Sequence, residues 1–440
     1  MRNSFLPLSG ILHSNENFDA TATMTGADAI APDETDTLAS AVSEINADES
    51  ALAAGNDQIE SAAVAADGLE TISEKVAAAN EGEGIDENTA EIIEASVESL
   101  LKIARIGVKY KQLGVPSSES FSIRANRVTL GKATCEALDI SAKKIWQSIV
   151  DAIKKSIEWV RNFFNKIFGA AERLEKRAAA LKESTTTLGG TAEETQLEND
   201  SLYNAVSING NPVKPSDLTA LAGEAKKVFA AQKKITDEFA KMDLGSGNTT
   251  VFLPSPSEFG LKAADAGTTK RITAEAGVQV SVTSRFPGEV VVYLAQPKDL
   301  GSSSKETGDY AGKIKAGSVN LQDKKAEGKS LKTLSIDEIK AVAGAVETFA
   351  GAVSEYKREL TEINNNKTKF IGKLEKFLSK GDGRDEGDSK DESSKKAKAN
   401  ATIFRKLMDE PAASLAANSV RSMSSALQYA ELSARQYSKN

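Results

Sequence analysis

Three long runs of apolar residues, spaced alternately three and four apart, constrain the fold of this 440-residue chain more than any other feature. The first run extends from Trp146 to Leu181, the second from Leu218 to Met242 and the third from Ile339 to Phe377. This spacing places the side chains along one stripe of a helix, which is stable when the stripe packs on other helices. The sequence therefore predicts a mainly α protein in which long heptad-patterned helices are packed as a bundle.

Residues at the helix ends support these assignments. Ser335 and Glu338 have the spacing of a capping box at the start of the third run, and Ser141 is a candidate N-cap of the first. Pro411 is typical of a first turn, and it predicts a last helix over residues 412–435.

Between the second and third runs the apolar period falls to two, which is typical of β-strands. Residues 278–282 alternate, residues 289–294 form a compact apolar run, and Pro287-Gly288 between them predicts a turn. Shorter strand candidates are residues 251–253 and 319–321. We expect a small β-hairpin or sheet inserted into the helical protein.

The two ends of the chain carry opposite charge. Residues 1–119 contain 22 acidic and 6 basic residues, whereas residues 120–440 contain 41 acidic and 49 basic residues. The net charge of -8 therefore combines an acidic leader of -16 with a basic body of +8. Such a leader can mask a basic surface until it is removed.

Composition suggests the domain organisation. Residues 1–85 are acidic with few apolar residues, which predicts a largely disordered segment, and a helix is predicted near residues 86–111. The predicted regions are an acidic leader (1–119), a basic helical region (120–210), a helix plus small β element (211–335), a long helix (336–380), a charged linker (381–399) and a C-terminal helix (400–440).

Catalytic and metal-binding patterns are missing from the sequence. The only histidine is His13, so residues 120–440 contain neither a histidine-dependent nucleophile nor a histidine-based zinc site. Cys135 is the only cysteine, which excludes an intrachain disulfide. No apolar run approaches the roughly 20 residues that cross a bilayer. We predict no catalytic residues, no metal, no cofactor and no enzymatic activity; an enzyme built from Asp, Glu, Lys or Tyr is an alternative that no spacing supports.

Residues 141–183 combine a basic stripe with a broad apolar face. The stripe consists of Lys144, Lys155, Lys166, Arg173 and Arg177. The apolar face consists of Trp146, Ile149, Ile153, Ile157, Trp159, Phe163 and Phe164. Three interpretations stay open: a bundle helix with solvated lysines, non-specific electrostatic contact with nucleic acid, and binding to a membrane surface.

A linker is predicted where the charge reverses. Gly114 and Pro116 end the helix before it, and this places Ser117-Ser118-Glu119-Ser120 in an extended, accessible segment. An ordinary linker between two domains is the alternative interpretation.

The residues after this linker resemble a known family. The resemblance covers about residues 105–182 and is carried by Phe121, the helix from Lys143 to Phe164, and residues 173–182. In these residues the chain is similar to the internal virion proteins of giant phiKZ-like bacteriophages, which a phage prohead protease processes in the head. That protease cuts after Ser-X-Glu or Ala-X-Glu, so the resemblance implies a cut after Glu119 and a mature chain that begins at Ser120.

The tripeptide alone is a weak signal. It also occurs at Ser14-Asn15-Glu16, Ala47-Asp48-Glu49 and Ser96-Val97-Glu98, and at several places in the body. Glu119 is preferred because it coincides with the charge reversal and lies in the predicted linker.

The resemblance implies a structural protein inside the capsid, made in the host cytoplasm with an acidic propeptide. The basic body would be packaged with the genome or in an inner body. The implied partners are the phage prohead protease, other head or inner-body proteins, and genomic DNA bound without sequence preference. The alternative is a membrane-active or adaptor protein that uses the amphipathic basic helix 141–183.

Overall fold

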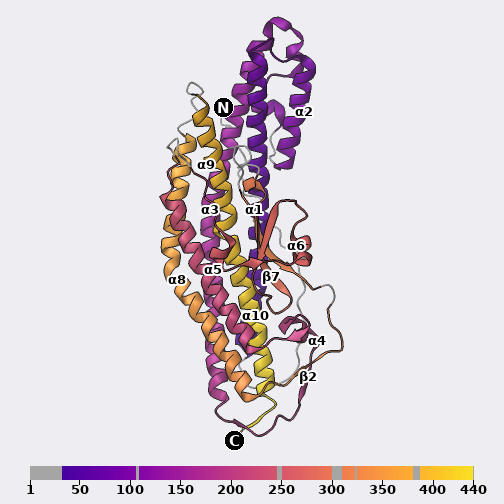
Figure 1. Ribbon diagram of the computed structural model, residues 1–440, viewed down its shortest axis with the longest axis vertical. Helices are drawn as coiled ribbons and strands as arrows, with labels where there is room; N and C mark the ends of the chain where they lie inside the picture. Colours follow the sequence, from indigo (N-terminus) through magenta and orange to yellow (C-terminus); the bar gives the residue numbers. More distant parts are fainter. Residues whose placement is uncertain are drawn as a thin grey trace. The chain divides into compact units, whose positions relative to one another are not determined.

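The computed structural model describes residues 32–105, 109–244, 250–299, 310–322, 325–379 and 387–439. Helices dominate these residues, and small antiparallel sheets accompany them (Figure 1), which confirms the predicted fold class. The α-helices are α1 (Pro32–Asn80), α2 (Glu87–Ile103), α3 (Arg127–Ser184), α4 (Asp200–Val206), α5 (Pro215–Lys241), α6 (Ala266–Ile272), α8 (Ile336–Ser379), α9 (Gly387–Met408) and α10 (Glu410–Ala434). Short 3-10 helices are η2 (Tyr110–Leu113), η3 (Ser118–Ser122), η4 (Arg124–Asn126) and η5 (Pro256–Phe259). The three predicted apolar runs lie in α3, α5 and α8.

The strands form small sheets. They are β1 (Leu188–Gly189), β2 (Gln196–Glu198), β3 (Ser207–Ile208), β4 (Asn211–Pro212), β5 (Lys262–Ala263), β6 (Val278–Val282), β7 (Val290–Pro297), β8 (Lys315–Asn320), β9 (Ser330–Lys332) and β10 (Ser438–Lys439). The largest sheet is antiparallel with the order β5-β6-β7-β8. The predicted hairpin is β6–β7, with Val280 opposite Ala295, and its turn places Gly288 and Glu289 at positive φ. The candidate strand at 319–321 overlaps the end of β8.

The candidate strand at 251–253 is wrong. No strand formed by the described residues pairs with it; instead the side chain of Asn400 in α9 hydrogen-bonds to the backbone of this segment. The Asn400 amide donates to the Thr250 carbonyl over 2.8 Å, and the Asn400 carbonyl oxygen accepts from the Phe252 N–H over 3.0 Å. A helix side chain therefore supplies the hydrogen bonds that a neighbouring strand would have supplied.

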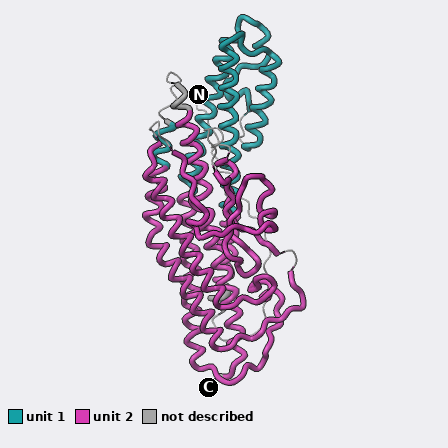
Figure 2. Tube along the Cα trace, viewed as in Figure 1, with its two compact units in different colours: residues 1–20, 51–156, 371–387 teal, residues 21–50, 157–370, 388–440 magenta. Residues whose placement is uncertain are grey.

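Contacts divide the chain into two compact units (Figure 2). Unit 1 comprises residues 1–20, 51–156 and 371–387. In it, the second half of α1 packs on α3, where the Ser73 hydroxyl donates to the Cys135 carbonyl over 3.3 Å. Cys135 is buried, so it serves as a packing residue here.

Unit 2 comprises residues 21–50, 157–370 and 388–440, and its core is a helix bundle. Tyr356 of α8 stacks on Phe229 of α5 with the ring centroids 4.4 Å apart, and Phe164 of α3 lies 4.9 Å from the same ring. Farther along the bundle, Phe370 of α8 lies 4.5 Å from Phe404 of α9. Aromatic side chains at the seam positions therefore join α3, α5, α8 and α9.

The leader is more ordered than its composition predicts. Helix α1 covers residues 32–80 and buries Leu38, Ile45, Leu52 and Ile59, which are seven residues apart. Burial along this stripe offsets the entropy that ordering an acidic segment costs. The predicted disorder is therefore wrong for residues 32–80, and residues 1–31 lie outside the described residues.

Several helix boundaries also differ from the prediction. Helix α3 begins at Arg127, so Ser141 is not an N-cap; its hydroxyl donates to the Ala137 carbonyl inside the helix over 2.7 Å. Residues 387–399 of the predicted charged linker 381–399 belong to α9, which begins at Gly387, and residues 381–386 lie outside the described residues.

Other boundaries agree with the prediction. The capping box at α8 is present, with the Ser335 N–H donating to the Glu338 carboxylate over 2.8 Å. The Glu338 N–H donates back to the Ser335 hydroxyl over 3.3 Å. The last helix, α10, has Pro411 in its first turn. The helix predicted near 86–111 is α2, which begins as predicted after the cap Asp86, whose side chain accepts from the Thr89 N–H, but which ends earlier than predicted, at Ile103.

Candidate functional site

The candidate cut lies on η3, between α2 and α3. The Ser120 N–H donates to the Ser117 carbonyl over 3.0 Å, which closes a 3-10 turn around Ser118 and Glu119. The side chains of Ser117, Glu119 and Ser120 are exposed, whereas Phe121 is buried. The side chains at the cut site are thus accessible, whereas its backbone is folded into a turn.

Contacts on both sides hold this segment in place. The Tyr110 hydroxyl donates to the Pro116 carbonyl over 3.3 Å, and the Arg127 side chain donates to the Phe121 carbonyl over 3.1 Å. Burial raises the pKa of the Tyr110 hydroxyl. The predicted extended linker at Ser117–Ser120 is therefore wrong, because the buried Phe121 draws the chain into a turn. A protease must unwind that turn to bind the segment.

Two of the competing tripeptides lie in regular helices. Ala47-Asp48-Glu49 is inside α1 and Ser96-Val97-Glu98 is inside α2, where Val97 is fully buried. Ser14-Asn15-Glu16 lies outside the described residues. Opening an α-helix breaks several backbone hydrogen bonds, so Glu119 lies in a segment that opens more easily than either of these two tripeptides.

Acidic side chains of the leader contact basic side chains of the body in unit 2. The Lys166 ammonium lies 2.8 Å from the Asp48 carboxylate and 3.3 Å from the Glu44 carboxylate. The hydrogen bond with Asp48 raises the pKa of Lys166. On α10, the Arg421 guanidinium donates to the side chain of Asn46. Lys166, a residue of the predicted basic stripe, is therefore neutralised by the leader.

Glu49 is the most buried acid of this contact. Its carboxylate accepts from the Ser318 hydroxyl over 2.8 Å and lies 3.9 Å from the Arg421 guanidinium. Desolvation raises the pKa of Glu49 and lowers the pKa of Arg421. The leader thus enters a polar, partly desolvated site formed by β8 and α10.

Replacing Glu49 by glutamine is expected to flatten the pH dependence of stability. Because burial raises the pKa of the folded carboxyl above its ordinary value of 4.5, the folded state binds more protons than the unfolded state between that value and the folded pKa. The free energy of unfolding therefore falls as pH rises through this window. Glutamine still accepts from Ser318 but has no proton to lose. Urea unfolding at a series of pH values should show the free energy of Glu49→Gln minus that of the parent rising with pH.

Glu375→Gln provides a comparison of opposite sign. A hydrogen bond from Lys154 lowers the pKa of Glu375, so the stability that this carboxylate contributes is present above the ordinary value of its pKa and is lost as pH falls. The free energy of unfolding of Glu375→Gln minus that of the parent should therefore fall as pH rises. Equal slopes for the two variants would contradict the assignment of Glu49.

The basic stripe is not one continuous surface. Lys144, Lys155 and Arg173 are exposed, Lys166 is paired with the leader, and Arg177 is buried. The Arg177 guanidinium forms a bidentate contact with Glu431 of α10, at 2.7 and 3.1 Å. The assignment of Arg177 to a solvent-facing stripe is therefore wrong, because its position at the edge of the α3 seam faces α10.

The amphipathic face of α3 is packed inside the protein. Trp146, Ile149, Ile153, Phe163 and Phe164 are buried, and Ile157 and Trp159 are partly exposed. Trp159 stacks on Phe163 with the ring centroids 5.9 Å apart. The face therefore serves as a bundle seam in this structure; contact with nucleic acid or a membrane remains a prediction.

A buried polar cluster was missed by sequence reasoning. Lys367 of α8 is fully buried and pairs with Asp409, the residue between α9 and α10. Gln232 of α5 donates to the Met408 carbonyl and accepts from the Tyr356 hydroxyl. Burial raises the pKa of Tyr356. In the sequence, the signal for this cluster is a polar residue at a seam position where the pattern requires an apolar one, as at Gln232 and Lys367.

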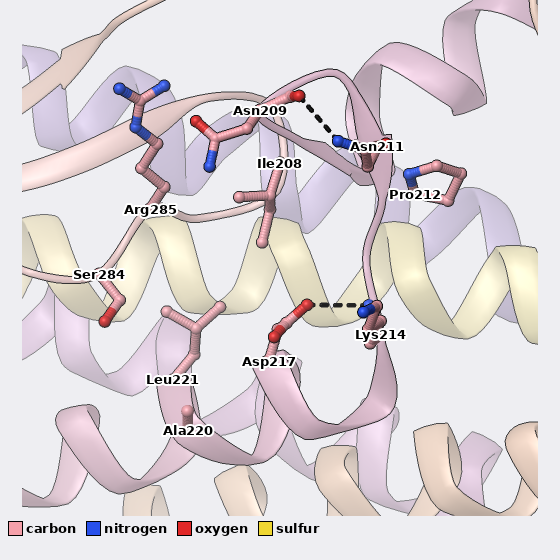
Figure 3. Close-up of a pocket in the computed structure, with 10 residues that line it drawn as sticks. All are labelled: Ile208, Asn209, Asn211, Pro212, Lys214, Asp217, Ala220, Leu221, Ser284 and Arg285. Atoms are coloured by element: carbon pink, nitrogen blue, oxygen red, sulfur yellow. Dashed lines mark hydrogen bonds between the residues drawn. The ribbon is translucent and has the colours of Figure 1, made fainter.

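An open hollow of about 760 Å³ lies beside α5 in unit 2 (Figure 3). Its charges are mixed: Asp217 accepts from the Lys214 N–H over 3.0 Å, and Arg285 pairs with Glu289 at 3.0 Å. This lining combines single charges of both signs, and at its edge the Ser284 hydroxyl donates to the Glu224 carboxylate over 2.6 Å.

Metal clusters and membrane spans are both missing from the described residues. Where the structure describes the chain, no three His, Cys, Asp or Glu side chains gather as a metal site. Of the helices formed by the described residues, none is long and apolar enough to span a membrane.

Comparisons with known proteins gave one match. A family model described as phiKZ-like phage internal head proteins matches residues 36–432, which include most of the leader helix α1 and most of α10. No curated protein and no solved structure matches the chain.

Proposed function

Because the chain belongs to the phiKZ-like phage internal head proteins, a family of proteins located inside the capsid, we propose that it is made as a precursor cut after Glu119. The phage prohead protease would cut the peptide bond that joins the acidic leader to the body, and the body beginning at Ser120 would be a structural, non-enzymatic component of the head. The observation that carries this proposal is the exposed Ser117-Ser118-Glu119 turn at the point where the charge reverses.

Contacts in unit 2 support a masking role for the leader. Glu44 and Asp48 neutralise Lys166, and Glu49 lies against Arg421. Removal of the leader takes away a charge of -16 and leaves a body of +8. A body of that charge fits among densely packed DNA, which needs positive charge near phosphates and no base-reading residues. Other head or inner-body proteins are the alternative neighbours of the body.

The membrane-active alternative has less support. It requires the apolar face of α3, including Trp146 and Phe164, to leave the core in which it is buried. That step exposes large aromatic and aliphatic side chains before any membrane contact compensates for the loss. We therefore favour the role inside the head.

N-terminal sequencing of the protein from purified particles should yield a chain that starts at Ser120. A Glu119→Gln variant should keep its leader, because it removes the acidic residue of the tripeptide. Glu98→Gln, which changes the competing tripeptide inside α2, should be cut like the parent. Particles in which the chain starts at Met1, with no product beginning at Ser120, would refute the processing step.

A further inference from the structure

Large exposed apolar side chains gather in unit 1. Among the described residues they are Val64, Ile92, Ile103, Ile123 and Ile140, and all five lie between residues 51 and 156. Ile92 is 66% exposed and Ile103 is 56% exposed, and both lie on α2. Their spacing places them on the face of α2 opposite its buried residues, such as Val97. A helix with apolar side chains on two faces has a second packing surface.

This second face of α2 borders a groove against α1. The groove has a volume of about 640 Å³, and its apolar lining includes Ile72 of α1 and Ile92, Ala95 and Leu100 of α2. Gly68 of α1 lets the two helices approach, since a Cβ at this position would lie 2.6 Å from a methyl carbon of Leu100. The groove is thus a built feature of the helix pair, with an apolar floor.

The surroundings of the groove are acidic. Residues 51–105 contain 12 acidic and 3 basic residues. On α2, Glu91 and Glu98 are exposed and seven residues apart, so they lie on one side of the helix, next to the face that carries Ile92. An apolar groove with acidic flanks is complementary to an apolar stripe with basic flanks.

We propose that this groove binds an amphipathic helix of a protein partner, with apolar residues at helical spacing and Lys or Arg on its flanks. Apolar side chains of that helix cover Ile72, Ile92 and Leu100, and its cations lie near Glu91 and Glu98. Helix-in-groove binding of this kind uses anchors three, four and seven residues apart. Nucleic acid and anionic membrane surfaces carry the same sign of charge as the groove, so they are disfavoured.

The location of the groove gives it a function that rests on the proposed processing. The groove lies entirely within residues 1–119, so a cut after Glu119 separates it covalently from the body. A partner held there is linked to the body through the covalent chain of the precursor, and after the cut it is linked to the mature chain only through the packing of α1. The leader then acts as a docking tag during assembly.

Binding can be measured on the full chain with a fluorescent model peptide, a 14-residue amphipathic helix of leucine and lysine. Fluorescence anisotropy at physiological salt should show saturable binding, which Ile92→Ser weakens at least tenfold. Ile140→Ser is the matched control, because it removes an exposed isoleucine of the same unit away from the groove, and it should bind like the parent. Glu91→Lys should also weaken binding. A scrambled peptide of equal charge should bind the parent chain no more tightly than it binds Ile92→Ser.

Each outcome decides the proposal. Equal affinity of the parent and Ile92→Ser for the peptide overturns it, and so does equal binding of a leucine–glutamate peptide. Circular dichroism of each variant checks that α2 stays helical. These measurements do not involve the protease, so failure of the groove leaves the cut after Glu119 standing, and an uncut leader in particles leaves the groove standing.

Discussion

Replacing Lys367 by methionine is expected to lower the free energy of unfolding by about 3–5 kcal/mol. Lys367 is fully buried and its ammonium pairs with Asp409. Without that partner, the buried Asp409 carboxylate loses the cation that offsets its desolvation, which costs far more than the lost contact itself. Urea unfolding of the full chain, followed by circular dichroism, measures the change.

Two further variants separate the effect of burying the pair from the effect of removing its charge. Lys182→Met removes a pair with Glu347 whose lysine side chain is 51% exposed, and it should cost less than about 1 kcal/mol. The double variant Lys367→Met, Asp409→Leu removes both buried charges and should recover part of the loss. If Lys367→Met costs no more than Lys182→Met, the buried pair does not determine stability.

Cutting the purified chain after Glu119 with the prohead protease is expected to leave residues 1–119 attached to the body. Helix α1 buries Leu38, Ile45, Leu52 and Ile59, and each fully buried aliphatic side chain contributes about 1.5–3 kcal/mol. One broken peptide bond removes none of these contacts. Size-exclusion chromatography should therefore show both fragments in one peak, which separates in denaturing urea.

Retention of the leader has an effect on DNA binding. Lys166 stays covered by Glu44 and Asp48 while α1 is bound, so DNA retention at moderate salt should be equal before and after the cut. Loss of the leader should raise DNA retention in a salt-sensitive manner. Leu38→Ala with Ile45→Ala should release the leader on cutting, because it removes two anchors of α1. Separate elution of the parent's leader in the absence of urea would contradict this prediction.

The helical bundle and the hairpin could be predicted because their patterns are strong. The seams of α3, α5 and α8 contain bulky side chains at regular spacing, and the turn at Pro287-Gly288 lies between an alternating run and a compact run of β-forming residues. Helix α1 was missed for a physical reason. Its bulky residues occur only once in seven, and small side chains such as Ala62 fill the other seam positions. The scarcity of large apolar residues therefore makes this regular stripe hard to recognise in the sequence.

The position of the candidate site along the chain could be predicted from the sequence, but its geometry could not. The tripeptide at Glu119 and the charge reversal are visible in the residues alone. The turn of η3 depends on the burial of Phe121, and the partner of Lys166 depends on the packing of α1, and no local pattern contains either contact. Arg177 illustrates the same limit, because its partner Glu431 lies 254 residues away.

The burial of Phe121 also affects the new end that a cut would create. A chain that starts at Ser120 has a single residue before a side chain fixed in the protein interior, and the Arg127 side chain holds the carbonyl of that second residue. Its terminal ammonium group is therefore tethered rather than fraying. Aminopeptidases bind several unfolded residues at the N-terminus of a substrate. This terminus does not provide them, so we expect it to resist these enzymes.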